Sequence, residues 1–169
     1  MDEPVSIQSF TWSHIGSFLS LRRQLARESI HVAMNDREHV EALPWVLARM
    51  VVHRKRTRIF LAADQGRFIG YATLLFPRFQ KFRGNAYLAT VSVQKSYRNR
   101  GIGTQLMHSV EQCARDRRAR RLELEVFSRN EAALCLYRKL GFVEEGRRRQ
   151  AVENVDGLDD IVFMAKMLV

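Results

Sequence analysis

A predicted strand followed by a basic loop with two closely spaced glycines is the feature that most restricts the fold of this chain. The strand pattern ends at Val93, and polar residues lead to Gly101 and Gly103, where a helical pattern begins. Glycine lets backbone N–H groups approach an anion, and a helix N-terminus adds about half a positive charge and unpaired donors. Arg98 and Arg100 add two cations. The segment predicts a phosphate site, although the glycines could also serve only to turn the strand into the helix.

The spacing of this loop excludes two common phosphate-binding motifs. A P-loop requires Gly-Lys-Ser/Thr at its end, and no such sequence follows here. The dinucleotide fingerprint requires glycine or alanine three residues after Gly103, where this chain has Leu106. The loop therefore belongs to a different class of anion site.

Changes in hydrophobic period along the 169 residues predict a mixed α/β fold in a single domain, 1–169. A length of about 100–200 residues is typical of one domain. The expected order is strand, two helices, three strands, helix, strand, helix and two strands. We expect these elements at 5–10, 13–28, 36–51, 57–63, 67–76, 86–93, 102–117, 121–127, 130–140, 142–145 and 160–168.

The spacing Arg98-x-x-Gly101-x-Gly103 resembles the Arg/Gln-x-x-Gly-x-Gly/Ala signature of the GNAT superfamily of N-acetyltransferases. The resemblance implies that acetyl-CoA is the co-substrate and that its pyrophosphate lies in this loop. It also implies that Val91 and Val93 offer main-chain hydrogen bonds to the pantetheine arm. The residues expected to line the pyrophosphate are Arg98, Asn99, Arg100, Gly101, Ile102, Gly103 and Thr104.

A second segment, 122–142, resembles the other cofactor motif of the same family: a strand, an asparagine, a helix with Leu-Tyr, and a terminal Gly-Phe. Asn130 would cap that helix, contact the cofactor, or do both. Two motifs in the family's order imply the GNAT fold. That fold has a central, mostly antiparallel sheet of about seven strands, splayed between the fourth and fifth, with about four flanking helices.

Two residues of this segment are candidates for catalysis. Transfer of an acetyl group to an amine needs a base to take a proton and a donor to stabilise the leaving thiolate. Tyr137 matches the family position that places an O–H near the sulfur, and cofactor contact is expected of it too; the alternative is a core tyrosine. Glu125 matches the general base of the ribosomal-protein N-terminal acetyltransferase branch, whereas a strand glutamate can also belong to a solvated face. Ordered water is a further alternative for the base.

The acceptor expected from the resemblance is a primary amine of a small molecule, such as an amino acid. The alternative is a protein N-terminus or a lysine side chain. The loop 77–85 carries Phe79 and Phe82 among Arg78, Lys81 and Arg83, and such a loop could contact a carboxylate-bearing acceptor. A homodimer and a cytoplasmic location are also expected.

The formal net charge of +10 indicates affinity for an anion but does not identify it. A basic nucleic-acid-binding module is the contrasting class, yet no helix-turn-helix, zinc or aromatic RNA-recognition motif occurs, so we expect no nucleic-acid partner. The histidines and cysteines lack ligand spacing, which predicts no metal. No apolar run approaches the ~20 residues that span a bilayer, so no membrane association is expected.

Overall fold

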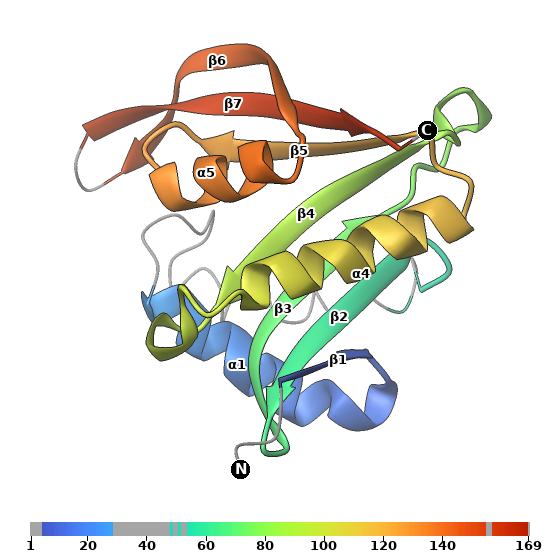
Figure 1. Ribbon diagram of the computed structural model, residues 1–169, viewed down its shortest axis with the longest axis vertical. Coiled ribbons are helices and arrows are strands. Elements are labelled where there is room, and N and C mark those ends of the chain that lie inside the picture. Colours follow the sequence, from blue (N-terminus) through green and yellow to red (C-terminus); the bar gives the residue numbers. More distant parts are fainter. Residues whose placement is uncertain (1–4, 29–47, 49–50, 52–53, 155–156, 169) are drawn as a thin grey trace.

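The computed structural model describes residues 5–28, 48, 51, 54–154 and 157–168. Its sheet has seven strands in the order β1-β2-β3-β4-β5-β7-β6 (Figure 1). Neighbouring strands are antiparallel, except that β4 and β5 are parallel. The elements are β1 Ser6–Ser9, the 3₁₀ turn Trp12–His14, α1 Ile15–Glu28, β2 Thr57–Asp64, β3 Arg67–Leu75, the 3₁₀ turn Gln80–Phe82, β4 Asn85–Val93, the 3₁₀ turn Lys95–Tyr97, α4 Ile102–Asp116, β5 Arg121–Phe127, α5 Glu131–Lys139, β6 Val143–Asn154 and β7 Gly157–Met167. The mixed, mostly antiparallel sheet that the sequence predicted is confirmed.

Three α-helices flank the sheet in the part of the chain that the structure describes. The helix expected over 36–51 lies largely outside the described residues. Helix α4 crosses one face of the sheet, and α1 lies on the other face against β2 and β3 (Figure 1). This layering explains why β2 reads as a continuous apolar run: strands buried on both faces need no polar alternation.

The two cores lie on opposite faces of the same strands. On one face, Leu106 and Val110 of α4 are fully buried against Ala72 and Leu74 of β3. On the other, Phe18 of α1 belongs to a separate cluster beneath β2 and β3, together with Leu21, Leu25, Ile59, Leu61 and Tyr71. Strands β2 and β3 are thus packed against a helix on each face.

Strands β4 and β5 are paired over only part of their length. Their register joins Asn85–Leu88 to Arg121–Leu124, although β4 continues to Val93 and β5 to Phe127. Figure 1 shows the two strands diverging beyond this short ladder. The predicted splay between the fourth and fifth strands is therefore confirmed, and it leaves the last part of β4 beside the N-terminus of α4.

Strand β6 is much longer than the sequence predicted, and β7 is slightly longer. The expectation of strands at 142–145 and 160–168 was too short, since β6 has 12 residues and β7 has 11. The cause is the polar character of β6, whose residues are exposed at nearly every position. At the edge of a sheet, backbone pairing with β7 can hold such a strand without an apolar face, so hydrophobic alternation gives no signal.

Candidate functional site

The loop between β4 and α4 has the backbone geometry that its glycines suggest. Gly101 is the N-cap of α4 and has φ +77°, a left-handed conformation that glycine adopts without a Cβ clash. Asn99 also has a positive φ of +61°. The first intrahelical bond recorded here runs from the Gln105 N–H to the Gly101 carbonyl at 3.1 Å. The three preceding N–H groups of the helix therefore have no intrahelical acceptor and are free to bind an anion.

The second glycine allows α4 to approach α5 closely. A Cβ on Gly103 would lie 3.2 Å from Cδ2 of Leu136, which is tighter than ordinary van der Waals contact. Between the two helices and the end of β4 there is a cleft of about 540 Å³. We call it the cofactor cleft. Its lining comprises Val91, Ser92, Val93, Tyr97, Arg98, Asn99, Gly101, Ile102, Gly103, Thr104, Asn130, Ala132, Ala133, Cys135, Leu136 and Lys139.

The structure brings together nine of the eleven residues that the sequence proposed for the cofactor. The two others, Arg100 and Tyr137, do not line the cleft. The guanidinium of Arg100 lies over the Tyr97 ring, 5.2 Å from its centroid. Arg98 donates from Nε to the Val93 carbonyl at 3.1 Å, so part of its side chain holds the end of β4.

Helix α5 contributes lining residues that the motif alone did not identify. Asn130 caps the helix, because its Oδ1 accepts from the Ala133 N–H at 3.2 Å. Cys135 and Lys139 follow on the cleft side, and Cys135 is exposed there. Helical spacing from Asn130 is the signal that could have located this face.

Tyr137, one helical turn after the cleft residue Ala133, is buried on α5 and does not itself line the cleft. Its side chain is 7% exposed, and its ring is 5.7 Å from that of Phe142. Burial, with a smaller contribution from the nearby Tyr87, raises the pKa of Tyr137 well above its ordinary value. The phenol is therefore held in its protonated form, in which it can donate a hydrogen bond.

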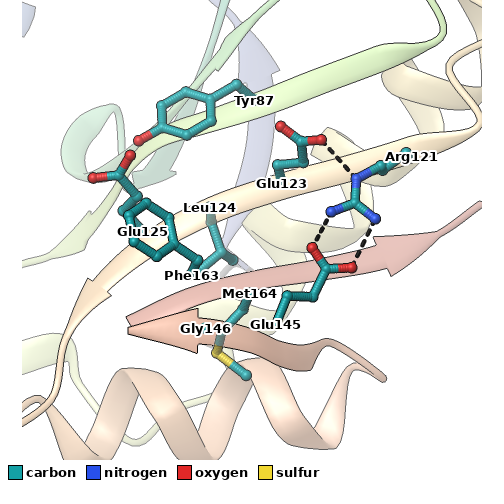
Figure 2. Close-up of a pocket in the computed structure, with 9 residues that line it drawn as sticks. All are labelled: Tyr87, Arg121, Glu123, Leu124, Glu125, Glu145, Gly146, Phe163 and Met164. Atoms are coloured by element: carbon teal, nitrogen blue, oxygen red, sulfur yellow. Dashed lines mark hydrogen bonds and ion pairs between the residues drawn. The ribbon is translucent and has the colours of Figure 1, made fainter. Parts of the chain in front are cut away.

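A second pocket, of about 430 Å³, lies on the face of β5 that is turned away from α4. Leu122, Leu124 and Val126 of this strand belong to the core on the α4 face, and the side chains between them point the opposite way. We call this the acidic pocket, since three carboxylates line it (Figure 2). Its lining comprises Tyr87, Arg121, Glu123, Leu124, Glu125, Glu145, Gly146, Phe163 and Met164.

The cation of this lining, Arg121, is held by two of the carboxylates. Its Nε donates to Glu123 Oε1 at 2.6 Å, and its two terminal nitrogens bind the two oxygens of Glu145. Asn85 Nδ2 also donates to Glu123 Oε1, at 2.8 Å. The hydrogen bond from Arg121 lowers the pKa of Glu145, so this carboxyl stays ionised as its partner requires. The network fixes one wall of the pocket across β4, β5 and β6.

Glu125 lies at the other end of the pocket and stands apart from this network. Figure 2 shows the Tyr87 hydroxyl directed at the Glu125 carboxylate. Burial and the hydrogen bond to this carboxylate raise the pKa of Tyr87 to about 12. Tyr87 therefore remains a donor that orients Glu125, while the Glu125 side chain is exposed. Sequence reasoning identified Glu125 but missed Tyr87, Arg121 and Glu145.

Two absences hold for the described part of the chain. It contains no group of three or more His, Cys, Asp or Glu side chains that could hold a metal. None of its helices is both long and apolar enough to cross a membrane.

Comparison with known families identifies the fold and the activity. The model of the acetyltransferase (GNAT) family matches residues 20–142. The chain belongs to the GNAT family. It is accordingly an acetyl-CoA-dependent N-acetyltransferase, as the two sequence motifs predicted.

Curated and solved GNAT relatives cover much of the chain. It is 27% identical over 142 residues to the ribosomal protein bS18-alanine N-acetyltransferase of Escherichia coli, with 83% of this chain and 93% of the relative aligned. It is 33% identical over 94 residues to N-alpha-acetyltransferase 30 of Schizosaccharomyces pombe, with 56% and 63% aligned, so this match spans less than two thirds of that relative. The structure of yncA from Salmonella typhimurium, solved with its cofactor acetyl-CoA, has a TM-score of 0.80 at 20% identity and covers 99% of this chain and 95% of that one.

Proposed function

We propose that this GNAT enzyme transfers the acetyl group of acetyl-CoA to the α-amino group at the N-terminus of a protein or peptide. The observation that carries the proposal is the composition of the acidic pocket, in which three carboxylates surround one cation that is already paired. An amine arrives largely as a cation, and carboxylates attract it. The relatives named N-alpha-acetyltransferase 30 and ribosomal protein bS18-alanine N-acetyltransferase support this acceptor better than the small molecule expected first.

The same pocket argues against a free amino acid as acceptor. An amino acid brings a carboxylate next to its amine, and that carboxylate needs a cation or several donors. Arg121 lines the pocket but is engaged by Glu123 and Glu145. None of the cations of the loop 77–85 lines either pocket, contrary to the expected role of that loop at the acceptor site. In a peptide the carboxylate is replaced by a neutral amide, so no counter-charge is needed.

Acetyl-CoA would occupy the cofactor cleft with its pyrophosphate on the N-terminus of α4. The free N–H groups of Ile102, Gly103 and Thr104 supply donors, and Arg98 adds charge. Val91 and Val93 would bind the pantetheine arm through their main chain, because β4 is unpaired with β5 at this level. The thioester would meet the acceptor amine where β4 and β5 are no longer paired.

The reaction then needs no covalent enzyme intermediate. The neutral amine attacks the thioester carbon, the C–N bond forms, and the C–S bond breaks to release CoA as a thiolate. Glu125 would take one proton from the ammonium group before the attack, either directly or through a water molecule, and the second proton would pass from the nitrogen to water as the amide forms. Tyr137 would donate a hydrogen bond to the departing sulfur. Since its raised pKa makes the phenol a weaker acid than a thiol of pKa about 8.5, we assign it hydrogen bonding ahead of full proton transfer.

A panel of matched acceptors tests the proposal. Thiol release from acetyl-CoA is measured with alanine, with alanine N-methylamide, and with a peptide that begins with alanine. We expect turnover with the amide and the peptide and little with alanine, because only alanine brings a second charge. Equal turnover of alanine and its amide would reject the argument from the pocket. Nα-acetyl-lysine amide and spermidine are the further controls, and a preference for either would reassign the acceptor to a side-chain or small-molecule amine.

A further inference from the structure

The positive charge of this protein is concentrated in three segments that line neither the cofactor cleft nor the acidic pocket. Residues 54–58, 78–83 and 115–120 contain eleven of the 28 lysines and arginines but a single carboxylate, Asp116. We call these three segments the basic end. Nine of the eleven cationic side chains are exposed. The net charge of these 17 residues is therefore as large as that of the whole chain.

The fold brings the three segments together at one edge of the molecule. Arg117 Nη1 donates to the Lys55 carbonyl at 2.9 Å, which joins the end of α4 to the segment before β2. The same guanidinium lies 4.7 Å from the centroid of the Phe76 ring, at the start of the loop after β3. The Arg120 N–H donates to the Gly84 carbonyl at 2.7 Å, at the end of that loop. In Figure 1 the end of α4, the start of β2 and the β3–β4 loop lie together on the right.

Two aromatic rings project from this cationic surface. Phe79 is 70% exposed and Phe82 is 55% exposed; Phe79 precedes the 3₁₀ turn Gln80–Phe82, and Phe82 is its last residue. Exposed phenylalanines cost free energy in water, since each leaves a large apolar area unburied. Their neighbours in the loop are Arg78, Lys81 and Arg83, all exposed. Aromatic rings among cations form the combination that binds unpaired bases and phosphates together.

We infer that the basic end binds a single-stranded nucleic acid. Nine of its eleven cations are arginines, whose planar guanidinium group binds phosphate through two hydrogen bonds and also stacks on bases. Phe79 and Phe82 supply the stacking platform. An anionic membrane is the less suitable partner, because interfacial anchoring needs an extended apolar helix face and this surface offers two rings on a loop. The inference departs from the expectation of no nucleic-acid partner.

This surface is separate from the reaction site. Helix α4 has 15 residues and is therefore about 20 Å long, with the glycine loop at its start and the basic end at its finish. A bound strand would thus leave the cofactor cleft open. It would bring the enzyme to amine acceptors that lie on or near nucleic acid, whichever amine the enzyme acetylates.

Fluorescence anisotropy with the full chain tests the inference. The probes are fluorescein-labelled oligo(U) RNA and oligo(dT) of about 15 nucleotides, within the range that one such surface occupies. The patch variant is Lys55→Gln/Arg78→Gln/Arg83→Gln, three exposed side chains outside both pockets. We expect it to weaken binding at least tenfold and to lower the salt slope by about two, since each lost phosphate contact removes about 0.7.

A control variant with the same loss of charge separates a local surface from net charge. Arg23→Gln/Arg67→Gln/Arg149→Gln removes three exposed cations elsewhere on the protein. We expect this variant to keep its affinity to within about threefold, because these residues would touch no phosphate. Equal loss in the two variants would overturn the inference, since binding would then follow overall charge alone.

The two aromatic residues provide an independent test. Phe79→Ala/Phe82→Ala should weaken binding to both oligonucleotides by about fivefold or more, as expected when stacked bases lose their platform. Unchanged affinity of this variant would overturn the stacking model. Sedimentation with phosphatidylserine vesicles measures binding to an anionic membrane, the alternative partner. Binding to vesicles but not to oligonucleotides would also overturn the inference. Acetyl-CoA titration of each variant checks that the fold and the cofactor cleft are intact.

Discussion

Replacement of Tyr137 by phenylalanine is the sharpest test of the proposed chemistry, because it removes one oxygen and keeps the ring. The side chain is 7% exposed and its ring packs 5.7 Å from that of Phe142, contacts that phenylalanine preserves. If the hydroxyl stabilises the leaving sulfur, its loss costs about 2.7–4 kcal/mol in the transition state, or about 100- to 1,000-fold in kcat. The affinity for acetyl-CoA should change little, since the cleft lining is untouched.

The raised pKa of Tyr137 adds a second expectation. Its hydroxyl is protonated throughout the range from about pH 6 to 9, because that range lies below the ordinary tyrosine pKa of about 10 and burial moves the value further up. The ratio of wild-type to variant kcat should therefore be constant across this range. Steady-state thiol release at saturating peptide measures both quantities. A variant with kcat within about twofold of the wild type would refute the role of the hydroxyl.

Tyr71 offers a matched control in the other core. It is also buried, and its hydroxyl is hydrogen-bonded with Arg22 and Thr90 beneath β3, away from both pockets. Tyr71→Phe should therefore lower the free energy of unfolding by about 1–3 kcal/mol, as loss of a partner for a buried polar group does, and leave kcat unchanged. Tyr137→Phe should show the reverse pattern. Urea unfolding followed by circular dichroism distinguishes the two outcomes.

Three further substitutions probe the base, the loop and the core. Glu125→Gln should reduce kcat by about 100-fold or more with an unchanged KM for acetyl-CoA, and an undiminished rate of thiol release would leave water as the base. Gly101→Ala should raise the KM for acetyl-CoA and lower the free energy of unfolding by about 1–2 kcal/mol, because a φ of +77° disfavours any residue with a Cβ. Calorimetric titration with acetyl-CoA and urea unfolding measure the two effects. Normal values in both experiments would contradict the requirement for glycine at this position. Lys166→Met should lower the free energy of unfolding by about 1–3 kcal/mol, since it removes the ammonium that binds the buried Glu111 carboxylate at 2.7 and 2.8 Å and leaves only Arg115 Nη2, at 3.7 Å, as its cationic partner. Urea unfolding with a normal midpoint would show that the Lys166–Glu111 pair is dispensable.

The cofactor side of the site could be predicted from the sequence because its residues are neighbours along the chain. Nine of the residues proposed for the cleft come from β4, the loop after it, the start of α4 and the N-cap of α5, each within a short recognisable segment. Glycine at a left-handed position and an asparagine at a helix cap also have local physical causes, which act wherever the segment occurs. Short contiguous segments of the sequence therefore predicted the local geometry of the cleft. The splay of β4 and β5 was implied by the same two motifs.

The acidic pocket could not be predicted in the same way because its residues meet only through the sheet. Tyr87, Arg121 and Glu145 come from three different strands, and β6 gave no strand signal beyond its first residues. The arginine run 115–121 spans the end of α4 and the start of β5. Its last member, Arg121, holds two carboxylates across β5 and β6, while the others form part of the basic end.

The net charge of +10 thus includes surfaces of opposite sign and is not one uniform property of the protein. The acidic pocket has more carboxylates than cations, which suits a cationic amine even though the chain as a whole would repel it. Because exposed charges are screened beyond about 10 Å at ordinary ionic strength, the local carboxylates and not the distant arginines decide what enters this pocket. The basic end, about the length of α4 away from the glycine loop, can attract a polyanion without competing for the acetyl donor. Raising the salt concentration should therefore weaken oligonucleotide binding far more than it changes the KM for the peptide amine.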